Sequence, residues 1–150
     1  MTEAKEAIRL TADVVALTTD DDGRLCVLLI KRGRDPYAGC WAFPGGHVDH
    51  DEETHDAARR ELMEETGLRA GEITLIGAYA KPNRDPRGRY VTFAYATVLD
   101  GPPPVLTAMD DAVDARWFPV RELSDNWMAF DHGQIVRDAV CATWLDGPRC

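Results

Sequence analysis

The sequence predicts an α/β fold in which helices cover a mixed β-sheet. Three observations support this class. The 150 residues suit one domain that extends over 1–150. Apolar, β-rich runs recur along the chain, and two segments, 54–66 and 132–145, have the character of longer helices. Since strands and helices do not alternate strictly, a mixed sheet is favoured over a parallel one.

The first half of the chain is expected to form a hairpin, a short strand and a helix. The expected elements are strands over 8–18 and 25–31, a short strand over 41–43 and a helix from about Thr54 to Thr66. Turn residues at 20–23 lie between the first two strands and predict a hairpin. Pro44-Gly45-Gly46 predicts a tight turn after the third strand. Acidic residues at the start of the helix suit the positive end of its dipole, and Gly67 follows at a natural stop.

The second half is expected to complete the sheet and to add a C-terminal helix. The expected elements are strands over 73–80 and 90–99, a short strand over 117–119, a small helix near 120–123 and a helix over 132–145. A loop rich in proline and arginine, 81–89, separates the two longer strands. Ile135, Ala139 and Ala142 are spaced to form one packing face of the last helix.

Composition argues against a membrane protein. Hydrophobic residues make up 45% of the chain and charged residues 29%, which is ordinary for a soluble globular protein. No apolar run approaches the roughly 18 residues that a membrane helix needs, and residues 1–10 contain neither a secretory signal nor a lipidation motif. We therefore expect a cytoplasmic protein with no membrane partner. Its four cysteines, which include no CxxC pair, are expected to be reduced thiols: Cys26, Cys40, Cys141 and Cys150.

The charge of the chain has one sign overall and the other sign locally. The net charge of −9 argues against a nucleic-acid partner, because affinity for a phosphate backbone depends on basic surface. Basic residues nevertheless gather in two loops: Lys31, Arg32 and Arg34 in one, and Lys81, Arg84, Arg87 and Arg89 in the other. These local clusters, rather than the net charge, are expected to matter for binding an anionic ligand.

Three glutamates of the helix predicted over 54–66 indicate a site for a cation. Glu61, Glu64 and Glu65 are spaced i, i+3 and i+4, which places them within an arc of about 100° on one helix face. Carboxylates held that close repel one another unless a cation lies among them. The alternative is a solvated acidic helix face, which is the usual meaning of such a spacing alone.

The surroundings of these glutamates match a longer pattern. It consists of Gly46, Glu52, Arg60, Glu61, Leu62, Glu64, Glu65, Gly67 and Leu68. All nine positions fit the Nudix box, so the chain resembles a Nudix hydrolase. The resemblance implies the Nudix fold, an α/β/α sandwich with a mixed sheet. It also implies hydrolysis of a nucleoside diphosphate that is linked to another group.

The resemblance assigns roles to the glutamates and their neighbours. Glu61, Glu64 and Glu65, with the carbonyl of Gly45, are the implied ligands of Mg²⁺, or of Mn²⁺ in its place; hard cations of this kind prefer oxygen ligands. Glu61, Glu64 and Arg60 are the implied catalytic residues, and Arg60 is expected to orient the glutamates. A further acid, Glu52, either ligates the metal through water or supports the start of the helix.

The general base and any further ligand have several candidates. The box offers Glu61 and Glu64 as bases, and a later loop offers Asp110, Asp111 and Asp114, for which plain surface charge is the alternative. His47, His50 and His55 suggest zinc, but they lack the cysteine and histidine spacing of a zinc site. Four rings are candidates for stacking on a base, with buried packing as the alternative for each: Trp41, Trp117, Trp127 and Phe130.

Two segments outside the box indicate the substrate. Residues 37–46 and 82–91 resemble the corresponding loops of ADP-ribose pyrophosphatase-like Nudix proteins. Arg84, Arg87 and Arg89 carry planar guanidinium groups suited to phosphate or ribose, and a solvated basic loop is the alternative. ADP-ribose, cleaved to AMP and ribose 5-phosphate, is therefore the first choice of substrate.

Two alternative functions and a homodimeric assembly are also considered. A nucleoside triphosphate pyrophosphohydrolase is the alternative within the same class. A non-catalytic ADP-ribose sensor that regulates transcription is the alternative from another class. The intact box argues against the sensor, and so do the residues after Phe118, which are too few for a DNA-binding domain besides the closing helix. Many members of the family are homodimers, and the N-terminal residues are the candidate interface.

Overall fold

The computed structural model describes residues 3–109 and 112–143, which contain seven strands, two α-helices and one 3₁₀ helix. The strands are β1 (Ile8–Thr19), β2 (Leu25–Arg32), β3 (Trp41–Ala42), β4 (Gly45–His47), β5 (Thr74–Tyr79), β6 (Arg89–Val98) and β7 (Ala112–Pro119). The helices are α1 (Thr54–Thr66), η1 (Val120–Glu122) and α2 (His132–Thr143).

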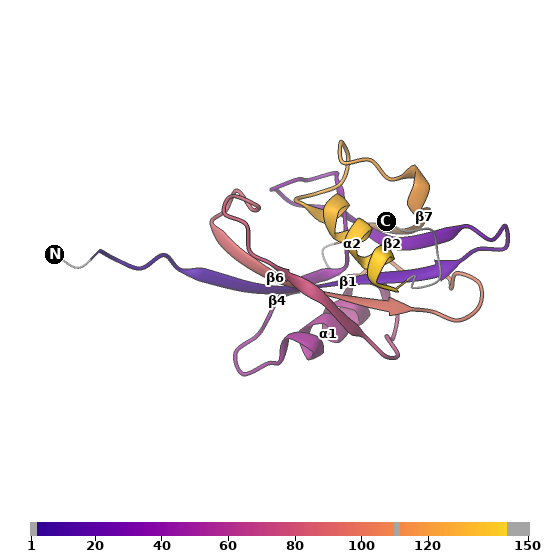
Figure 1. The fold of residues 1–150 in the computed structure, drawn as a ribbon, viewed down its shortest axis with the longest axis horizontal. Helices are drawn as coiled ribbons and strands as arrows, with labels where there is room; N and C mark the ends of the chain where they lie inside the picture. The colour runs from indigo at the N-terminus through magenta and orange to yellow at the C-terminus, as the bar shows by residue number, and fades with distance from the viewer. Residues whose placement is uncertain (1–2, 110–111, 144–150) are drawn as a thin grey trace.

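The sheet is mixed, as the sequence predicts. Its central order is β3-β2-β1-β6-β5, with β4 paired to β1 and β7 paired to β2. β1 runs parallel to β6, whereas the remaining pairs are antiparallel. The expected hairpin of β1 and β2 is present, with Leu17 opposite Val27. Figure 1 shows the long strand β1 crossing the middle of the molecule beside β6.

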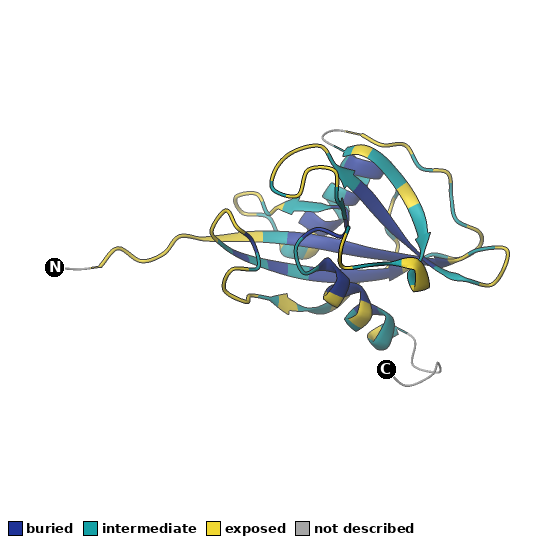
Figure 2. Ribbon diagram, turned by 90° about the horizontal axis from the view of Figure 1, so that it is seen from above, coloured by how far each residue is buried: buried dark blue, intermediate teal, exposed yellow. Residues whose placement is uncertain are grey.

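The two α-helices cover opposite faces of this sheet. Successive side chains of a strand point to opposite faces, and β1 follows this rule. Val15 and Leu17 pack against the core side of α2, whereas Val14 and Ala16 pack with α1. Because both faces are covered, residues 14–17 of β1 are apolar and fully buried, whereas the first residues of the strand are exposed (Figure 2). The predicted α/β/α sandwich is confirmed.

Helix α1 has the bounds that the sequence predicts. It begins at Thr54 and ends at Thr66, and Gly67 follows with a φ of +75°. This left-handed conformation lets the Gly67 N–H donate to the carbonyl of Met63, which closes the last turn. Ala58 and Leu62 are buried against the sheet, and Glu61, Glu64 and Glu65 lie beside them on α1 and line the cleft described below.

Two strands and one cysteine differ from expectation. Residues 45–47 pair with β1 as strand β4 instead of forming only a turn, because the sheet supplies partners that local propensity does not reveal. β7 is longer than expected, since it pairs with nearly all of β2. Cys26 and Cys40 are free thiols, but Cys141 is disulfide-bonded, so the expectation of a reduced thiol there is wrong. Sequence spacing alone cannot show which cysteines come together; Cys150 lies outside the described residues.

None of the helices in the described part of the chain is both long enough and apolar enough to cross a membrane.

Candidate active site

A cleft of about 770 Å³ lies where β1, β4 and α1 meet the end of β2 and the segments before β6 and α2. One wall is acidic and consists of Asp13, Asp49, Glu61, Glu64 and Glu65. The other group of lining residues, the basic wall, is basic and aromatic and includes Arg32, Arg34, Arg84, Arg87, Tyr90 and Phe130. The volume suits a small-molecule ligand. The opposed charges suit a ligand that carries phosphate beside a cation.

Arg60 connects the predicted glutamates on the acidic wall. Its Nη1 donates to Glu61 Oε1 at 2.9 Å and to Glu64 Oε2 at 3.1 Å. Its Nε donates to Glu52 Oε2 at 2.8 Å, and its Nη2 donates to the His47 carbonyl at 3.0 Å. These contacts raise the pKa of Arg60, Glu52 contributing most. One guanidinium therefore sets the positions of several carboxylates at once.

Glu52 lies at the start of α1, where it supports the approach to the helix. Its carboxylate accepts from Arg60 and, at 2.9 Å, from the backbone N–H of Asp49. The Arg60 hydrogen bond lowers the pKa of Glu52 to about 2. These contacts match the supporting role that the sequence left open beside metal ligation through water.

Glu65 and Glu61 are carboxylates for which burial disfavours the charged form. Burial raises the pKa of Glu65 to about 8, with Glu61 and Asp13 adding to the rise, although the Gly45 N–H donates to Glu65 Oε1 at 2.8 Å. Burial also raises the pKa of Glu61, against the opposing influence of Arg60. Crowded, partly buried carboxylates of this kind require a proton or a cation to compensate them. Their oxygen atoms are the ligands that Mg²⁺ prefers, so the residues present fit a hard divalent ion.

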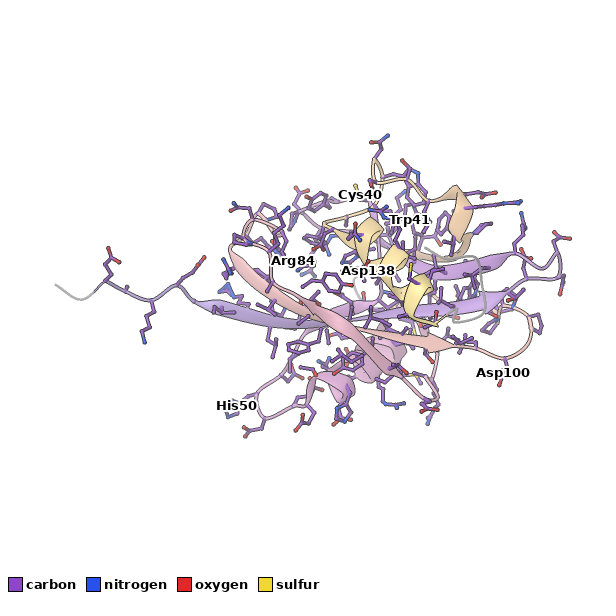
Figure 3. The ribbon with its side chains drawn as sticks, in the orientation of Figure 1. Cys40, Trp41, His50, Arg84, Asp100 and Asp138 are labelled. Carbon is purple, nitrogen blue, oxygen red and sulfur yellow. The ribbon has the colours of Figure 1, made fainter. Side chains whose placement is uncertain are left out.

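In this structure the oxygen atoms of the carboxylates are not gathered around a common point. No group of three or more His, Cys, Asp or Glu side chains within residues 3–109 and 112–143 is arranged to hold an ion. Glu61 and Glu64 turn to Arg60, and Glu65 turns to Gly45. Of the histidines weighed for zinc, His47 lies at the cleft, whereas His50 and His55 are exposed. His50 is labelled in Figure 3, on the far side of the sheet from α2.

Gly45 and Gly46 are required because backbone and carboxylates approach them closely. A Cβ on Gly45 would collide with the Asp13 side chain and the Ala12 carbonyl. A Cβ on Gly46 would lie 2.5 Å from Glu61 Oε1. Only a residue without a side chain lets β4 pass between β1 and α1 at this point.

The structure brings two of the three predicted substrate-binding arginines to the cleft. Arg84 is almost fully buried and pairs with Asp131 through Nε at 3.0 Å and Nη2 at 2.6 Å (Figure 3). Arg87 pairs with Asp85, and its guanidinium lies 4.6 Å from the centre of the Tyr90 ring. Arg89 lines a separate, shallow depression instead. Arg84 thus connects its loop to the residue before α2, and the Arg87 guanidinium stacks on the Tyr90 ring in the cleft.

Arg32 is a cleft residue that the sequence placed only in a basic cluster. Its guanidinium lies 4.9 Å from the centre of the Phe130 ring, and its Nε donates to the Pro36 carbonyl at 2.8 Å. It forms no ion pair with any residue that the structure describes. Burial and the nearby Arg87 lower the pKa of Arg32. A half-buried guanidinium without a carboxylate partner is suited to an anionic ligand.

Phe130 is held in a conformation that bulky residues rarely adopt. Its φ is +51°, in the left-handed region. The ring lies 4.8 Å from the ring of Tyr37 and contacts the guanidinium groups of both Arg32 and Arg87. Such backbone strain is often found at functional sites. The sequence named Phe130 as one of four candidate rings, but no local signal distinguished it from the tryptophans.

The loop candidates for the general base are not brought to the cleft. Asp114 lies on β7, opposite Lys31 of β2, where it accepts from Arg116 Nε at 2.8 Å. It does not line the cleft. Asp110 and Asp111 lie outside the described residues. Glu61 and Glu64 remain the candidates that lie in the cleft.

Comparisons with known proteins agree with this geometry. Residues 9–139 match the NUDIX domain. The chain is 40% identical over 121 residues to an ADP-ribose pyrophosphatase of Methanocaldococcus jannaschii, an alignment that covers 81% of this chain and 68% of that protein. It is 30% identical over 132 residues to the ADPR responsive transcriptional repressor NtrR of Acinetobacter baylyi, with coverage of 87% and 52%. The chain therefore spans about half the length of that repressor.

A solved structure gives the corresponding match in three dimensions. The NUDIX domain of NrtR from Shewanella oneidensis, complexed with ADP ribose, superposes with a TM-score of 0.79 at 30% identity. The superposition covers 90% of this chain and 88% of that one. The family match and the superposed fold both point to the same family as the motif around the glutamates. The chain belongs to the Nudix family, and this match together with the pyrophosphatase relative indicates a diphosphate hydrolase.

Proposed function

We propose that this protein hydrolyses ADP-ribose to AMP and ribose 5-phosphate. The observation that carries the proposal is the cleft itself, which is lined both by carboxylates and by guanidinium groups stacked on Phe130 and Tyr90. The pyrophosphatase relative supports ADP-ribose as the substrate, and so does the similar domain that was crystallised with ADP ribose.

The proposed cofactor is Mg²⁺, with Mn²⁺ as its replacement. Glu61, Glu64 and Glu65 would hold it, together with the carbonyl of Gly45. A divalent cation supplies charge neutralisation at the phosphates and lowers the pKa of an attacking water. The burial of these carboxylates supports the assignment. It raises the pKa of both Glu61 and Glu65, and a bound cation would compensate their negative charge.

The residues of the chain divide the remaining work between binding and orientation. Arg32 and Arg87 would pair with the negative charge of the phosphates. Cation–π contacts with Phe130 and Tyr90 orient these two guanidinium groups. Arg60 holds two of the glutamates in position. Water would attack one phosphorus in line, the anhydride P–O bond would break, and the leaving phosphate oxygen would carry away the electron pair. Glu61 and Glu64 are the candidates to accept the proton of the water.

A turnover screen with and without Mg²⁺ tests this proposal. The panel is ADP-ribose, NADH, dinucleoside polyphosphates and nucleoside triphosphates, with product release measured for each. We expect Mg²⁺-dependent turnover with a preference for ADP-ribose and AMP as a product. A clear preference for a triphosphate, with pyrophosphate released, would instead support the pool-cleanup alternative.

A sensor function remains the second candidate because of the repressor relative. Tight ADP-ribose binding without Mg²⁺-dependent turnover of any panel member would favour it. The intact set of box residues argues for catalysis, since sensing alone does not require that every one of these carboxylates be present.

A homodimer, a cytoplasmic location and the absence of a nucleic-acid partner stay predictions. The exposed side chains of Ile8 and Leu10, on the N-terminal half of β1, are consistent with the predicted interface. A light-scattering mass equal to that of one chain would reject the dimer.

A further inference from the structure

His132 is a buried histidine that the proposed chemistry does not use. It is the first residue of α2, its relative exposure is 3%, and it is one of the residues that line the cleft. Its ring stacks on Phe43 with the ring centres 4.7 Å apart. A polar ring in this position needs partners for its nitrogen atoms.

Both ring nitrogens of His132 face specific groups. Nδ1 accepts the backbone N–H of Phe43 at 3.1 Å, so the proton of the neutral ring is on Nε2. Nε2 lies 3.8 Å from Asp13 Oδ2, which is too far for a direct hydrogen bond but close enough for attraction. The same Asp13 oxygen accepts from the hydroxyl of Thr92 at 2.6 Å.

These partners lie beside the segment that leads into Gly45, whose carbonyl is a proposed metal ligand. Phe43 precedes Gly45 by two residues, and the side chain of Asp13 fills the space next to Gly45 where a Cβ would stand. The Pro44 carbonyl between them accepts from Val14 N–H at 2.9 Å. The Gly45 N–H then donates to Glu65 Oε1 at 2.8 Å. A continuous chain of contacts therefore leads from His132 to a carboxylate of α1.

The segment before His132 strengthens this connection. The Trp41 N–H donates to the Trp127 carbonyl at 3.0 Å, and the Ala129 N–H donates to the Trp41 carbonyl at 2.8 Å. The segment before α2 thus contacts Trp41, at one end of this stretch, and the first residue of α2 contacts Phe43, at the other. Among these contacts, the Phe43 bond is made by a side chain, so a substitution can remove it without altering the backbone ladder.

We propose that His132 is a positioning residue for the metal site: its Nδ1 fixes the Phe43–Gly45 turn and, through the Gly45 N–H, the orientation of Glu65. This role rests on the proposed function, because it assumes that Glu65 and Gly45 contribute to cation binding. Residues that orient metal ligands in this way commonly change metal affinity or activity by about 10- to 100-fold when they are replaced.

Two variants that differ in whether they keep a hydrogen-bond acceptor test the proposal. In His132→Asn the Oδ1 atom takes the place of Nδ1 and can accept the Phe43 N–H, whereas His132→Leu has a similar shape and no acceptor. Val136→Ala is the matched control, because Val136 is buried on the same helix and contacts the core away from the cleft. The wild-type protein and the three variants are compared at equal concentration, with circular dichroism used to verify folding.

The first readout is Mn²⁺ binding without substrate, measured from the electron paramagnetic resonance of the free ion. We expect His132→Leu to bind Mn²⁺ about tenfold more weakly than the wild type, with His132→Asn close to the wild type and Val136→Ala unchanged. The second readout is hydrogen exchange of the Phe43 amide by NMR. Exchange should be fast in His132→Leu and slow in the other three proteins. With ADP-ribose, kcat of His132→Leu should fall while KM stays within about twofold.

The outcomes separate this inference from the proposed function. Wild-type protein that binds no Mn²⁺ and does not turn over ADP-ribose overturns the proposed function and, with it, the role of His132. Wild-type protein that does both, while His132→Leu retains its Mn²⁺ affinity and kcat, overturns the positioning role alone. If His132→Leu does not fold, His132→Ala, which also lacks an acceptor, takes its place: a tenfold loss of Mn²⁺ affinity that His132→Asn does not share supports the role, and equal affinities of these two variants reject it.

Discussion

The two walls of the cleft differ in how their residues are distributed along the chain. The acidic wall comes mainly from the stretch of the motif, since four of its five carboxylates lie within 16 residues of one another: Asp49, Glu61, Glu64 and Glu65. The basic wall combines Arg32, Arg87 and Phe130, which come from three distant segments. Helical geometry fixes the first set locally, whereas the second set meets only after the sheet has formed. A sequence motif is therefore a good guide to one wall and a poor guide to the other.

The acidic wall should be the more sensitive of the two to single substitutions. In Glu64→Gln the charge is removed while the shape is kept, and Glu64 is a candidate both as metal ligand and as general base. We expect kcat with ADP-ribose to fall by about a thousandfold, with the fold intact by circular dichroism. Turnover within about tenfold of the wild type would show that Glu64 is not part of the catalytic machinery.

The acidic wall should also make the stability of the metal-free protein depend on pH. The pKa of Glu65 is raised from 4.5 to about 8. Between these two pH values the carboxyl group is therefore protonated in the folded state and ionised in the unfolded state. The free energy of unfolding therefore decreases as pH rises from 4.5 to about 8, by up to about 4 kcal/mol from this group. Glu65→Gln removes this contribution.

Thermal melts in EDTA between pH 5 and pH 8 measure the effect. Relative to Glu65→Gln, the wild type should lose stability as pH rises, and Mg²⁺ should restore the wild type at pH 8. Comparing the two proteins cancels the contribution of other groups, such as His132, whose pKa is lowered by burial. Melting curves of equal pH dependence would mean that Glu65 is not held protonated in the metal-free fold.

The basic wall should affect binding of the substrate more than the chemical step. Replacing Arg32 by Gln removes a charged group that has no ion-pair partner in the described part of the chain. We expect KM for ADP-ribose to rise by about 10- to 100-fold, the value of one or two charge-assisted hydrogen bonds. Lys31→Gln is the control, because it removes the same charge one residue away, from a side chain that does not line the cleft. Equal effects of both substitutions would indicate a general electrostatic influence rather than a contact.

The smallest effect is expected outside both walls. Asp114 pairs with Arg116 on β7 and does not line the cleft. Asp114→Asn should change kcat by less than about twofold, as expected for an exposed ion pair. A loss of several orders of magnitude would instead make Asp114 the general base, reached through a movement of β7 toward the acidic wall.

Much of the fold follows from local patterns. The β1–β2 hairpin and both ends of α1 were predicted because turn residues and Gly67 mark them in the sequence. β4 was not predicted as a strand, since its two glycines have low strand propensity and pair only because β1 offers an edge. The disulfide bond at Cys141 was not predicted either, because the spacing of cysteines does not show which thiols pair.

The candidate site shows the same division. The order of Glu61, Glu64 and Glu65 along one helix determines a carboxylate cluster in any fold that keeps the helix, because a helix places i, i+3 and i+4 side by side. Only the tertiary structure decided that Arg32 and Phe130 line the same cleft as that cluster, that Arg89 does not, and that His132 holds the turn before Gly45. Contacts across 80 or more residues depend on sheet pairing and helix packing, as between Phe43 and His132. Such contacts are set by the free energy of the whole core and not by any local pattern of residues.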